Sequence, residues 1–393
     1  MTVRASSVEV EVAPVLDRAR PPGGLGFDWA MVGFTAWLLA GVYLDGWAHL
    51  HVPELESFFT PWHAVLYSGF LAAATFLVGS LLRNRMKGFP WAKALPDGYQ
   101  LSLVGAVIFA AAGVGDMLWH LAFGVESDFE ALFSPTHLGL ALGAALIGTG
   151  PLRAGWRRSD LDTDPRSWAT QLPVVLSLAF LLSEFTFFTQ DAHPFGLTWP
   201  AEALRPSQAA VRLLGYHSST EEMFQLLGAF GFILQSGILM SVVLLALRRW
   251  PLRPGTLTLI FTLNASLMAF MRDIFLATSP YVLVLVAILG GAAADLLLWR
   301  LRPSTERPGR LRCFAFLVPT LLYTLYFLAL MLTGGIWWSV PMWTGSVVYA
   351  GLVGWLLSYL LVPPSLWPGH PRWIQNREAH RRQESEEATR EHL

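Results

Sequence analysis

The residues best suited to chemistry in this chain form a short pattern, Asp-x-x-x-His followed by Thr/Ser-Pro-x-His. Its first copy consists of Asp45, His49 and the segment Thr60-Pro61-Trp62-His63. An Asp and a His four residues apart share one face of a helix, and a short turn can bring a second His back to the same place. One carboxylate and two imidazoles make a metal-ligand set, so the spacing predicts a metal site.

The same pattern returns later in the chain as Asp116, His120 and the segment Ser134-Pro135-Thr136-His137. Two imidazoles and a carboxylate suit Zn²⁺, non-haem Fe²⁺ and copper alike. Because the pattern holds no Cys or Met ligand, a dedicated thiolate or thioether site for Cu(I) is not expected. The six ligands could form one dinuclear centre or two mononuclear centres, and the sequence leaves both open.

A purely structural role is the alternative for these residues. Thr60-Pro61 and Ser134-Pro135 have the form of a helix N-cap followed by proline at the first helical position, so they are expected to start helices in either case. Asp45 and Asp116 argue against a structural role alone. An Asp one turn inside a membrane helix is costly unless it is paired, so we predict that both triads bind metal.

The composition indicates that membrane helices hold these ligands. Of the 393 residues, 54% are hydrophobic and 14% are charged, and the mean hydropathy is +0.46, which excludes an ordinary soluble domain. The formal net charge of −1 and the lack of a basic patch with interleaved aromatics argue against a nucleic-acid partner. The single cysteine, Cys313, excludes an intrachain disulfide.

Apolar stretches long enough to cross ~30 Å of hydrocarbon recur along the chain. They predict an all-α, polytopic integral membrane bundle of about ten transmembrane helices, built partly from repeated helical hairpins. The expected domains are a cytoplasmic segment 1–28, a transmembrane domain 29–362 with metal-site hairpins 29–82 and 100–152, and a charged cytoplasmic tail 363–393. The predicted spans are 29–50, 61–82, 100–122, 135–152, 173–190, 221–247, 256–278, 280–299, 313–333 and 339–362.

Basic residues cluster in alternate loops and set the expected orientation. The turns 51–60, 121–134 and 333–339 contain no Lys or Arg. By the positive-inside rule the basic loops and both termini are cytoplasmic, so both triads face the outside of a bacterial-type plasma membrane. The basic loops follow the second, fourth, sixth and eighth spans, and they contain Arg83, Arg85, Lys87, Lys93, Arg153, Arg157, Arg158, Arg166, Arg248, Arg249, Arg253, Arg300, Arg302, Arg307, Arg310 and Arg312.

Further polar residues are expected near the outer end of the bundle. His51 is one step off the face of Asp45 and His49, so an interfacial contact is favoured over ligation. Arg272 and Asp273 are expected to form an internal ion pair. Trp47, Trp62 and Trp119 are expected to wall an apolar pocket beside the ligands. The candidates for residues that surround and support the metal ligands are Glu184, His193, His217 and Asp273.

In this pattern the chain resembles one of the integral membrane subunits of the copper membrane monooxygenases, the particulate methane and ammonia monooxygenases. The motif of that family is an Asp, a His four residues on, and a second His within an aromatic-Thr-Pro-Ser-His segment. The segments 59–63 and 133–137 look like the aromatic segment, and Glu126-Ser-Asp128-Phe129 is similar to the acidic turn before it. The resemblance covers roughly 45–63 and 116–137. It implies a metal site, with copper favoured, on both triads.

Three classes of function follow from the sequence. The first is a metal-dependent membrane oxidoreductase, monooxygenase-like, that acts on a small or lipophilic substrate and uses the open position of a three-ligand site. The second is a non-catalytic protein that stores or passes copper or zinc. The third is a membrane zinc hydrolase. Expected partners are membrane lipid and such a substrate, with a second copy of the chain or other membrane proteins left open. No catalytic residue is assigned.

Overall fold

The computed structural model describes residues 20–52, 58–124, 130–158, 167–206 and 219–363. Within these ranges the chain is an all-α bundle. The described residues form two isolated β-bridges and no sheet. Nine helices of the described part are long and apolar enough to cross a membrane. The predicted all-α, polytopic fold is therefore confirmed.

The helices follow one another along the chain, and the longest connection between them is 189–218. Each of the predicted spans corresponds to one helix or to one pair of consecutive helices. The helices are α2 (Gly24–His51), α3 (Pro61–Met86), α4 (Gln100–Phe123), α5 (Glu130–Phe133), α6 (Pro135–Gly148), α7 (Gly150–Arg157), α9 (Trp168–Phe188), α11 (Ser219–Arg249), α12 (Thr256–Met271), α13 (Pro280–Leu301), α14 (Pro308–Thr333) and α15 (Val340–Leu361).

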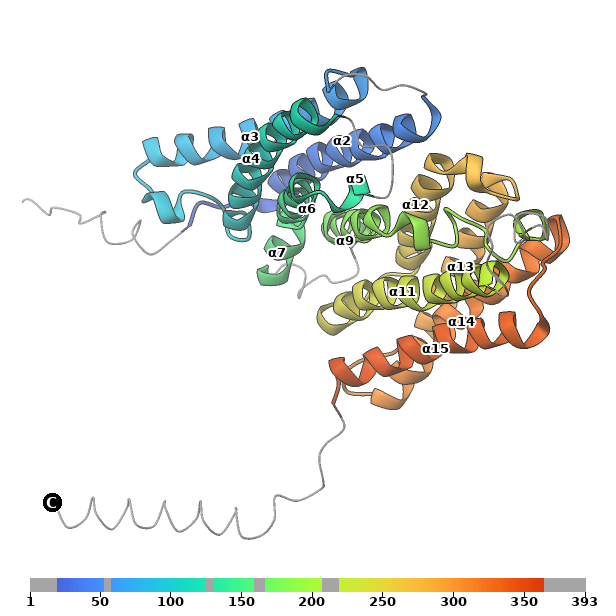
Figure 1. The fold of residues 1–393 in the computed structure, drawn as a ribbon. Coiled ribbons are helices and arrows are strands. Elements are labelled where there is room, and N and C mark those ends of the chain that lie inside the picture. The colour runs from blue at the N-terminus through green and yellow to red at the C-terminus, as the bar shows by residue number, and fades with distance from the viewer. Residues whose placement is uncertain (1–19, 53–57, 125–129, 159–166, 207–218, 364–393) are drawn as a thin grey trace, which may run out of the picture.

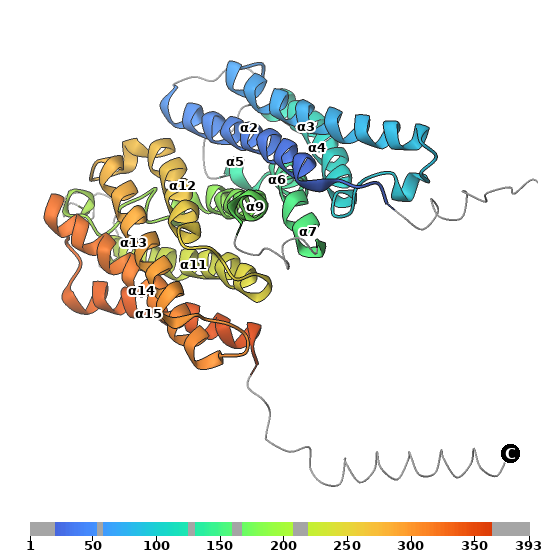
Figure 2. The ribbon, with the colours of Figure 1, turned by 180° about the vertical axis from the view of Figure 1, so that it is seen from behind.

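Neighbouring helices pair as hairpins, and α9 joins two groups of them. The pairs α2 with α3, α4 with α6, α12 with α13 and α14 with α15 pack along their lengths. Helix α9 packs against α2 and α7 on one side and against α11 and α12 on the other. Figures 1 and 2 show α9 between the amino-terminal hairpins and the carboxyl-terminal helices. The two hairpins with the repeated pattern therefore form one half of the molecule.

Side-chain caps fix where the two metal-site hairpins turn back. The hydroxyl of Thr60 accepts a hydrogen bond from the backbone N–H of His63 (3.1 Å), and Ser134 accepts one from His137 (3.2 Å). Each cap is followed by proline in the first turn, where its missing N–H costs nothing. The predicted helix starts are confirmed, and they place His63 and His137 on the first turn of their helices.

Glycines bring the helices of each hairpin close together. A side chain at Gly41 of α2 would clash with the backbone of Leu66 in α3. A Cβ atom at Gly143 of α6 would lie 2.8 Å from the backbone nitrogen of Phe109 in α4. Small residues at such crossings let membrane helices approach closely. The close approach allows a ligand on one helix to reach ligands on the next.

The seventh predicted span, 256–278, is wrong over its last residues. Helix α12 ends at Met271, and a 3₁₀ turn, Asp273–Phe275, follows. Arg272, the residue after the helix, is buried and forms an ion pair with Asp191 (2.9 Å). The chain leaves the helix where this guanidinium group turns toward polar partners. At about 24 Å for 16 residues, α12 is shorter than the hydrocarbon layer.

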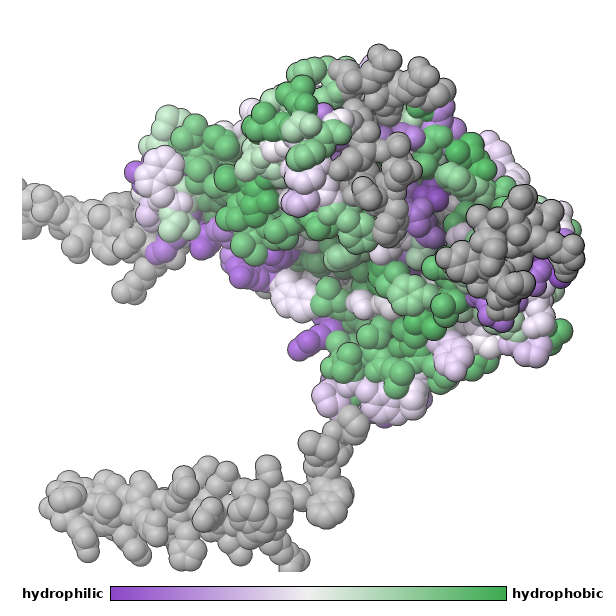
Figure 3. Space-filling view, viewed as in Figure 1, coloured by the Kyte–Doolittle hydropathy of each residue, from purple (hydrophilic) through white to green (hydrophobic). Residues whose placement is uncertain are grey.

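The outer surface of the bundle is apolar, as contact with lipid requires. Figure 3 shows hydrophobic side chains across much of one face of the molecule. Leu71 of α3 and Val107 and Leu118 of α4 are among the large apolar residues that are more than half exposed. The start of α2 and the end of α15 lie at the same end of the bundle (Figure 1). That this end lies on the cytoplasmic side of the membrane stays a prediction.

Several predictions fall on segments outside the described residues. These are the terminal segments 1–19 and 364–393, the acidic turn Glu126-Ser-Asp128-Phe129 and His217.

Candidate metal centre

The first triad lies where α2 ends and α3 begins. Asp45 and His49 occupy consecutive turns of α2, and His63 is on the first turn of α3. The Nε2 atom of His63 lies 3.4 Å from Oδ1 of Asp45, and the Nε2 atom of His49 lies 3.8 Å from Oδ2. The carboxylate therefore presents one oxygen to each imidazole. One ligand atom from each residue lies within 4.8 Å of the others.

The second triad repeats this geometry where α4 ends and α6 begins. The Nε2 atom of His137 lies 3.5 Å from Oδ1 of Asp116, and the Nε2 atom of His120 lies 3.6 Å from Oδ2. These ligand atoms also lie within 4.8 Å of one another. The sequence prediction that Asp, His and the capped His converge holds in both hairpins.

The distances between nitrogen and oxygen atoms fit a bound ion better than direct hydrogen bonds. A charge-assisted N–H···O bond is about 2.7–2.9 Å long, and the four distances here are 3.4–3.8 Å. Two ligands bound at about 2.0–2.2 Å with a tetrahedral angle between them are about 3.4 Å apart. The residues present therefore fit a metal ion in each triad.

Three of the four histidines are oriented through their second ring nitrogen. The Nδ1–H of His63 donates to the carbonyl oxygen of Phe58, and that of His120 donates to the carbonyl oxygen of Gly124 (3.1 Å). Nδ1 of His137 bonds the Ser134 hydroxyl (2.6 Å). A carbonyl only accepts, so the proton sits on Nδ1 of His63 and His120 and leaves the Nε2 lone pair for a metal.

The two triads form separate groups in the described residues and do not share a ligand. The ring of Phe58 lies between them, with its centroid 4.7 Å from that of His63 and 6.0 Å from that of His120. An aromatic ring in this position favours two mononuclear sites over one dinuclear site. No sequence signal pointed to Phe58, because it belongs to the turn and not to the repeated pattern.

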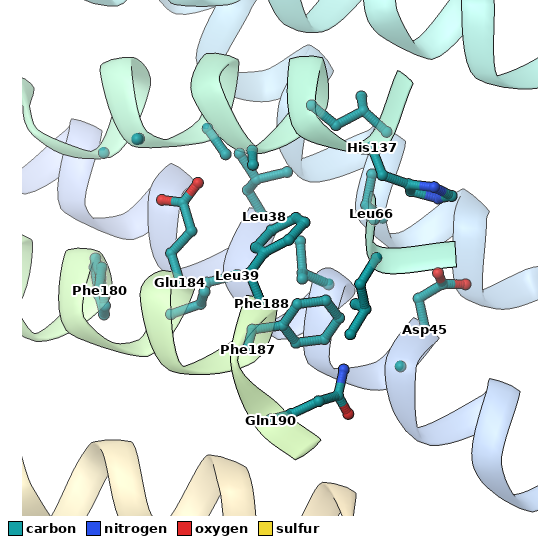
Figure 4. Close-up of a pocket in the computed structure, with 18 of the residues that line it drawn as sticks. Leu38, Leu39, Asp45, Leu66, His137, Phe180, Glu184, Phe187, Phe188 and Gln190 are labelled. Carbon is teal, nitrogen blue, oxygen red and sulfur yellow. The ribbon is translucent and has the colours of Figure 1, made fainter. Parts of the chain in front are cut away.

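Residues of both triads line one cavity of about 330 Å³. Asp45 and His49 come from the first triad and His137 from the second. Figure 4 shows Asp45 and His137 at one end and Glu184 of α9 toward the other. The other lining side chains are mainly apolar, and they include Leu38, Leu39, Leu140, Phe180, Phe187 and Phe188. The volume lies at the lower end of the range of small-molecule sites.

The walls of this cavity differ from the expectation. Trp47, Trp62 and Trp119 do not line it, although they stand beside the ligands in sequence. The ring of Trp47 instead stacks on that of His51, with centroids 4.5 Å apart. The apolar walls come from α2 and α6 and also from α9, which contributes Phe187 and Phe188. Sequence reasoning missed the wall from α9 because this helix carries no part of the pattern.

The expected ion pair between Arg272 and Asp273 is wrong. Arg272 pairs with Asp191, and Asp273 accepts a hydrogen bond from Nε2 of His51 (2.7 Å). His51 is outside the ligand set, as expected, and its Nδ1 meets the carbonyl oxygen of Trp47 (2.8 Å). Asp273 therefore fixes the end of α2 near the first triad, across the interface between the two halves of the molecule.

His193 lies away from both triads. It is buried, and its Nδ1 accepts a hydrogen bond from the backbone N–H of Phe195 (3.1 Å). It lines a different, small cavity together with Thr186, Asn264 and Tyr323. Burial, helped by the charge of Arg272, lowers the pKa of His193 to about 3. The residue is thus a neutral structural histidine and does not support the metal ligands.

Comparisons of the chain with protein-family models, with curated proteins and with solved structures found no match. The likeness to copper membrane monooxygenases thus rests on the pattern alone. The geometry supports a helical membrane protein with two largely buried Asp/His/His groups that could hold metal.

Proposed function

We propose that this chain is an integral membrane metalloprotein in which each triad holds one metal ion. The main support is that each of the two hairpins presents one carboxylate and two Nε2 atoms, at the separations expected of ligands around one ion. Chance packing of polar residues would not repeat the same pairing of Oδ1 and Oδ2 with the same histidine positions. The orientation of the rings through Nδ1 supports the same conclusion.

Copper is the metal we favour. The support is the likeness of both triads to the Asp-x-x-x-His and Thr-Pro-Ser-His motif of the copper membrane monooxygenases. Nitrogen and oxygen ligands also accept zinc or iron, so metal identity is an outcome of the test below. The basic loops support a bacterial-type plasma membrane with both triads at its outer face.

The activity we propose is oxidation of a small lipophilic substrate. Three protein ligands leave a coordination position open, and a redox-active ion there supplies electron transfer. The chain itself supplies an apolar cavity that the ligand residues Asp45, His49 and His137 border. Such a cavity binds apolar molecules, orients them against the triads and excludes water.

Metal storage or transfer is the second candidate. Its support is that the ligand side chains of His49 and His137 are 23% and 24% exposed, which would let an ion enter and leave. Tight binding of metal without substrate oxidation would favour this candidate. Bound zinc together with hydrolysis of a lipid substrate would favour a membrane hydrolase.

Metal analysis of the purified full-length protein tests the proposal. We expect two copper ions per chain by mass spectrometry, and oxygen consumption that depends on an added alkane or alcohol. His63→Ala and His137→Ala should each lose one ion, while His370→Ala in the tail should keep both. If the wild-type protein stays metal-free after incubation with copper, zinc and iron, the proposal is wrong.

A further inference from the structure

Two buried polar atoms lie without a partner at the end of the cavity away from the triads. They are Oε1 of Glu184 in α9 and Oγ1 of Thr35 in α2, and neither has a hydrogen-bond partner among the described residues. Both residues line the cavity. Thr35 is only 5% exposed. A buried polar group left without a partner costs free energy, so this pair marks a place where a polar group of a ligand would bind favourably.

The two atoms belong to one small region. The Glu184 carboxyl lies against the backbone of Ala145, and Cγ2 of Thr35 lies 3.0 Å from where a Cβ of Gly148 would be. Positions 145 and 148 are three residues apart on α6, so they lie on one face and about 4.5 Å apart along the axis. A single polar group between α2, α6 and α9 could therefore contact both side chains.

The polar region and the triads stand at a fixed separation. His137 and Ala145 are eight residues apart on α6, which corresponds to about 12 Å along the helix axis. Apolar side chains such as Leu38 and Phe188 line the space between them (Figure 4). The cavity thus has a polar inner end at Glu184 and Thr35, a mainly apolar middle and a metal-ligating outer end. Thr149, Gln190, Asp191 and Arg272 also line it. A ligand of matching polarity has one polar group and an alkyl chain.

A hydroxyl group fits the inner end better than a charged group. A hydroxyl donates one hydrogen bond and accepts others, so it matches the Thr35 hydroxyl and the Glu184 carboxyl in either protonation state. An ammonium group would require an ionised Glu184, and burying both charges carries a large desolvation cost. A plain alkane would leave both polar atoms without partners.

We propose that the cavity binds an aliphatic alcohol, with its hydroxyl between Glu184 and Thr35 and its alkyl chain directed toward the triads. The assignment of this alcohol as the substrate rests on the proposed function. Binding of the alcohol does not rest on the proposed function, because neither Glu184 nor Thr35 belongs to a triad. The two claims can therefore fail separately.

Photolabelling of the full-length protein in lipid nanodiscs tests this binding. The probe is an octanol with a diazirine on its alkyl chain, and mass spectrometry locates the labelled peptides and measures the bound metal in the same sample. We expect label in α2, α6 or α9, and we expect octanol to compete at roughly tenfold lower concentration than octane. Absence of label from these helices, equal competition by octane, or stronger competition by octylamine would each overturn the proposal.

Variants test whether the two polar atoms are responsible. Thr35→Val and Glu184→Leu should each reduce the preference for octanol about tenfold, and Glu184→Gln, which keeps a hydrogen-bonding group, should retain most of it. Thr262→Val and Ser183→Ala are matched controls, because their hydroxyls are also buried without a described partner but do not line the cavity.

An unchanged preference in Glu184→Leu, or an equal loss in the controls, would contradict the assignment. Alcohol binding by a protein that stays metal-free after incubation with copper, zinc and iron would refute the proposed function and leave the binding proposal intact.

Discussion

The hydroxyl of Thr136 donates a 2.9 Å hydrogen bond to Oδ1 of Asp116, the oxygen that faces His137. The first triad has no equivalent, because Trp62 stands between its proline and His63. The side chain of Asp116 is also 2% exposed, and that of Asp45 is 17% exposed. The second carboxylate is thus better oriented and more deeply buried than the first. The two sites are similar in ligands and different in their surroundings.

The Thr136 hydroxyl should therefore raise the metal affinity of the second triad. Thr136→Val keeps the shape of the side chain and removes the donor, and we expect the affinity of this site to fall about tenfold or more. Competition with a chelator of known affinity measures the effect, with Thr324→Val on the exposed side of α14 as the control. Equal weakening of both sites would show that the hydroxyl acts on the fold and not on Asp116.

The two triads should bind metal independently. Because Phe58 lies between them and no ligand is shared, Asp45→Ala should halve the metal content and leave the affinity of the remaining site unchanged. Titration of the variant with copper measures both quantities. A metal–metal distance of about 4 Å or less in X-ray absorption spectra would instead indicate a dinuclear centre.

His193 should make the protein less stable in mild acid. Its pKa in the folded protein is about 3, below the usual value near 6.5, because the ring is buried. The unfolded chain therefore binds a proton that the folded chain does not, and stability present above about pH 6.5 is lost as the pH falls toward 3. The limiting slope is about 1.4 kcal/mol per pH unit.

Thermal unfolding between pH 7.5 and 5 tests this effect against His193→Asn, whose side chain can still accept from the N–H of Phe195. The unfolding temperature of the variant should depend less on pH than that of the wild type. Parallel pH profiles would mean that other groups cause any loss of stability in acid.

The orientation in the membrane is testable with reporter fusions. Because basic residues follow the even-numbered predicted spans, a reporter fused after Arg166 should be active in the cytoplasm, and one placed near Ser207 should be active outside. The reverse pattern would put both triads at the cytoplasmic face.

The sequence alone determined the parts of this protein that depend on short-range geometry. Asp45 and His49 share a helix face because they are four residues apart, and Thr60 starts the next helix because its hydroxyl can cap it. These two facts bring His63 back to the carboxylate, and the same reasoning applies to the second triad. The helical membrane fold followed from the length of the apolar stretches.

Only the tertiary structure decided which distant groups meet. The partner of Asp273 is His51, which is 222 residues away along the chain. Glu184 faces the same cavity as Asp45 because α9 packs against α2 and α6 in one particular rotation. Such contacts depend on how whole helix faces pack together. Helix spacing in the sequence specifies which residues share a face, but not which other helix that face contacts.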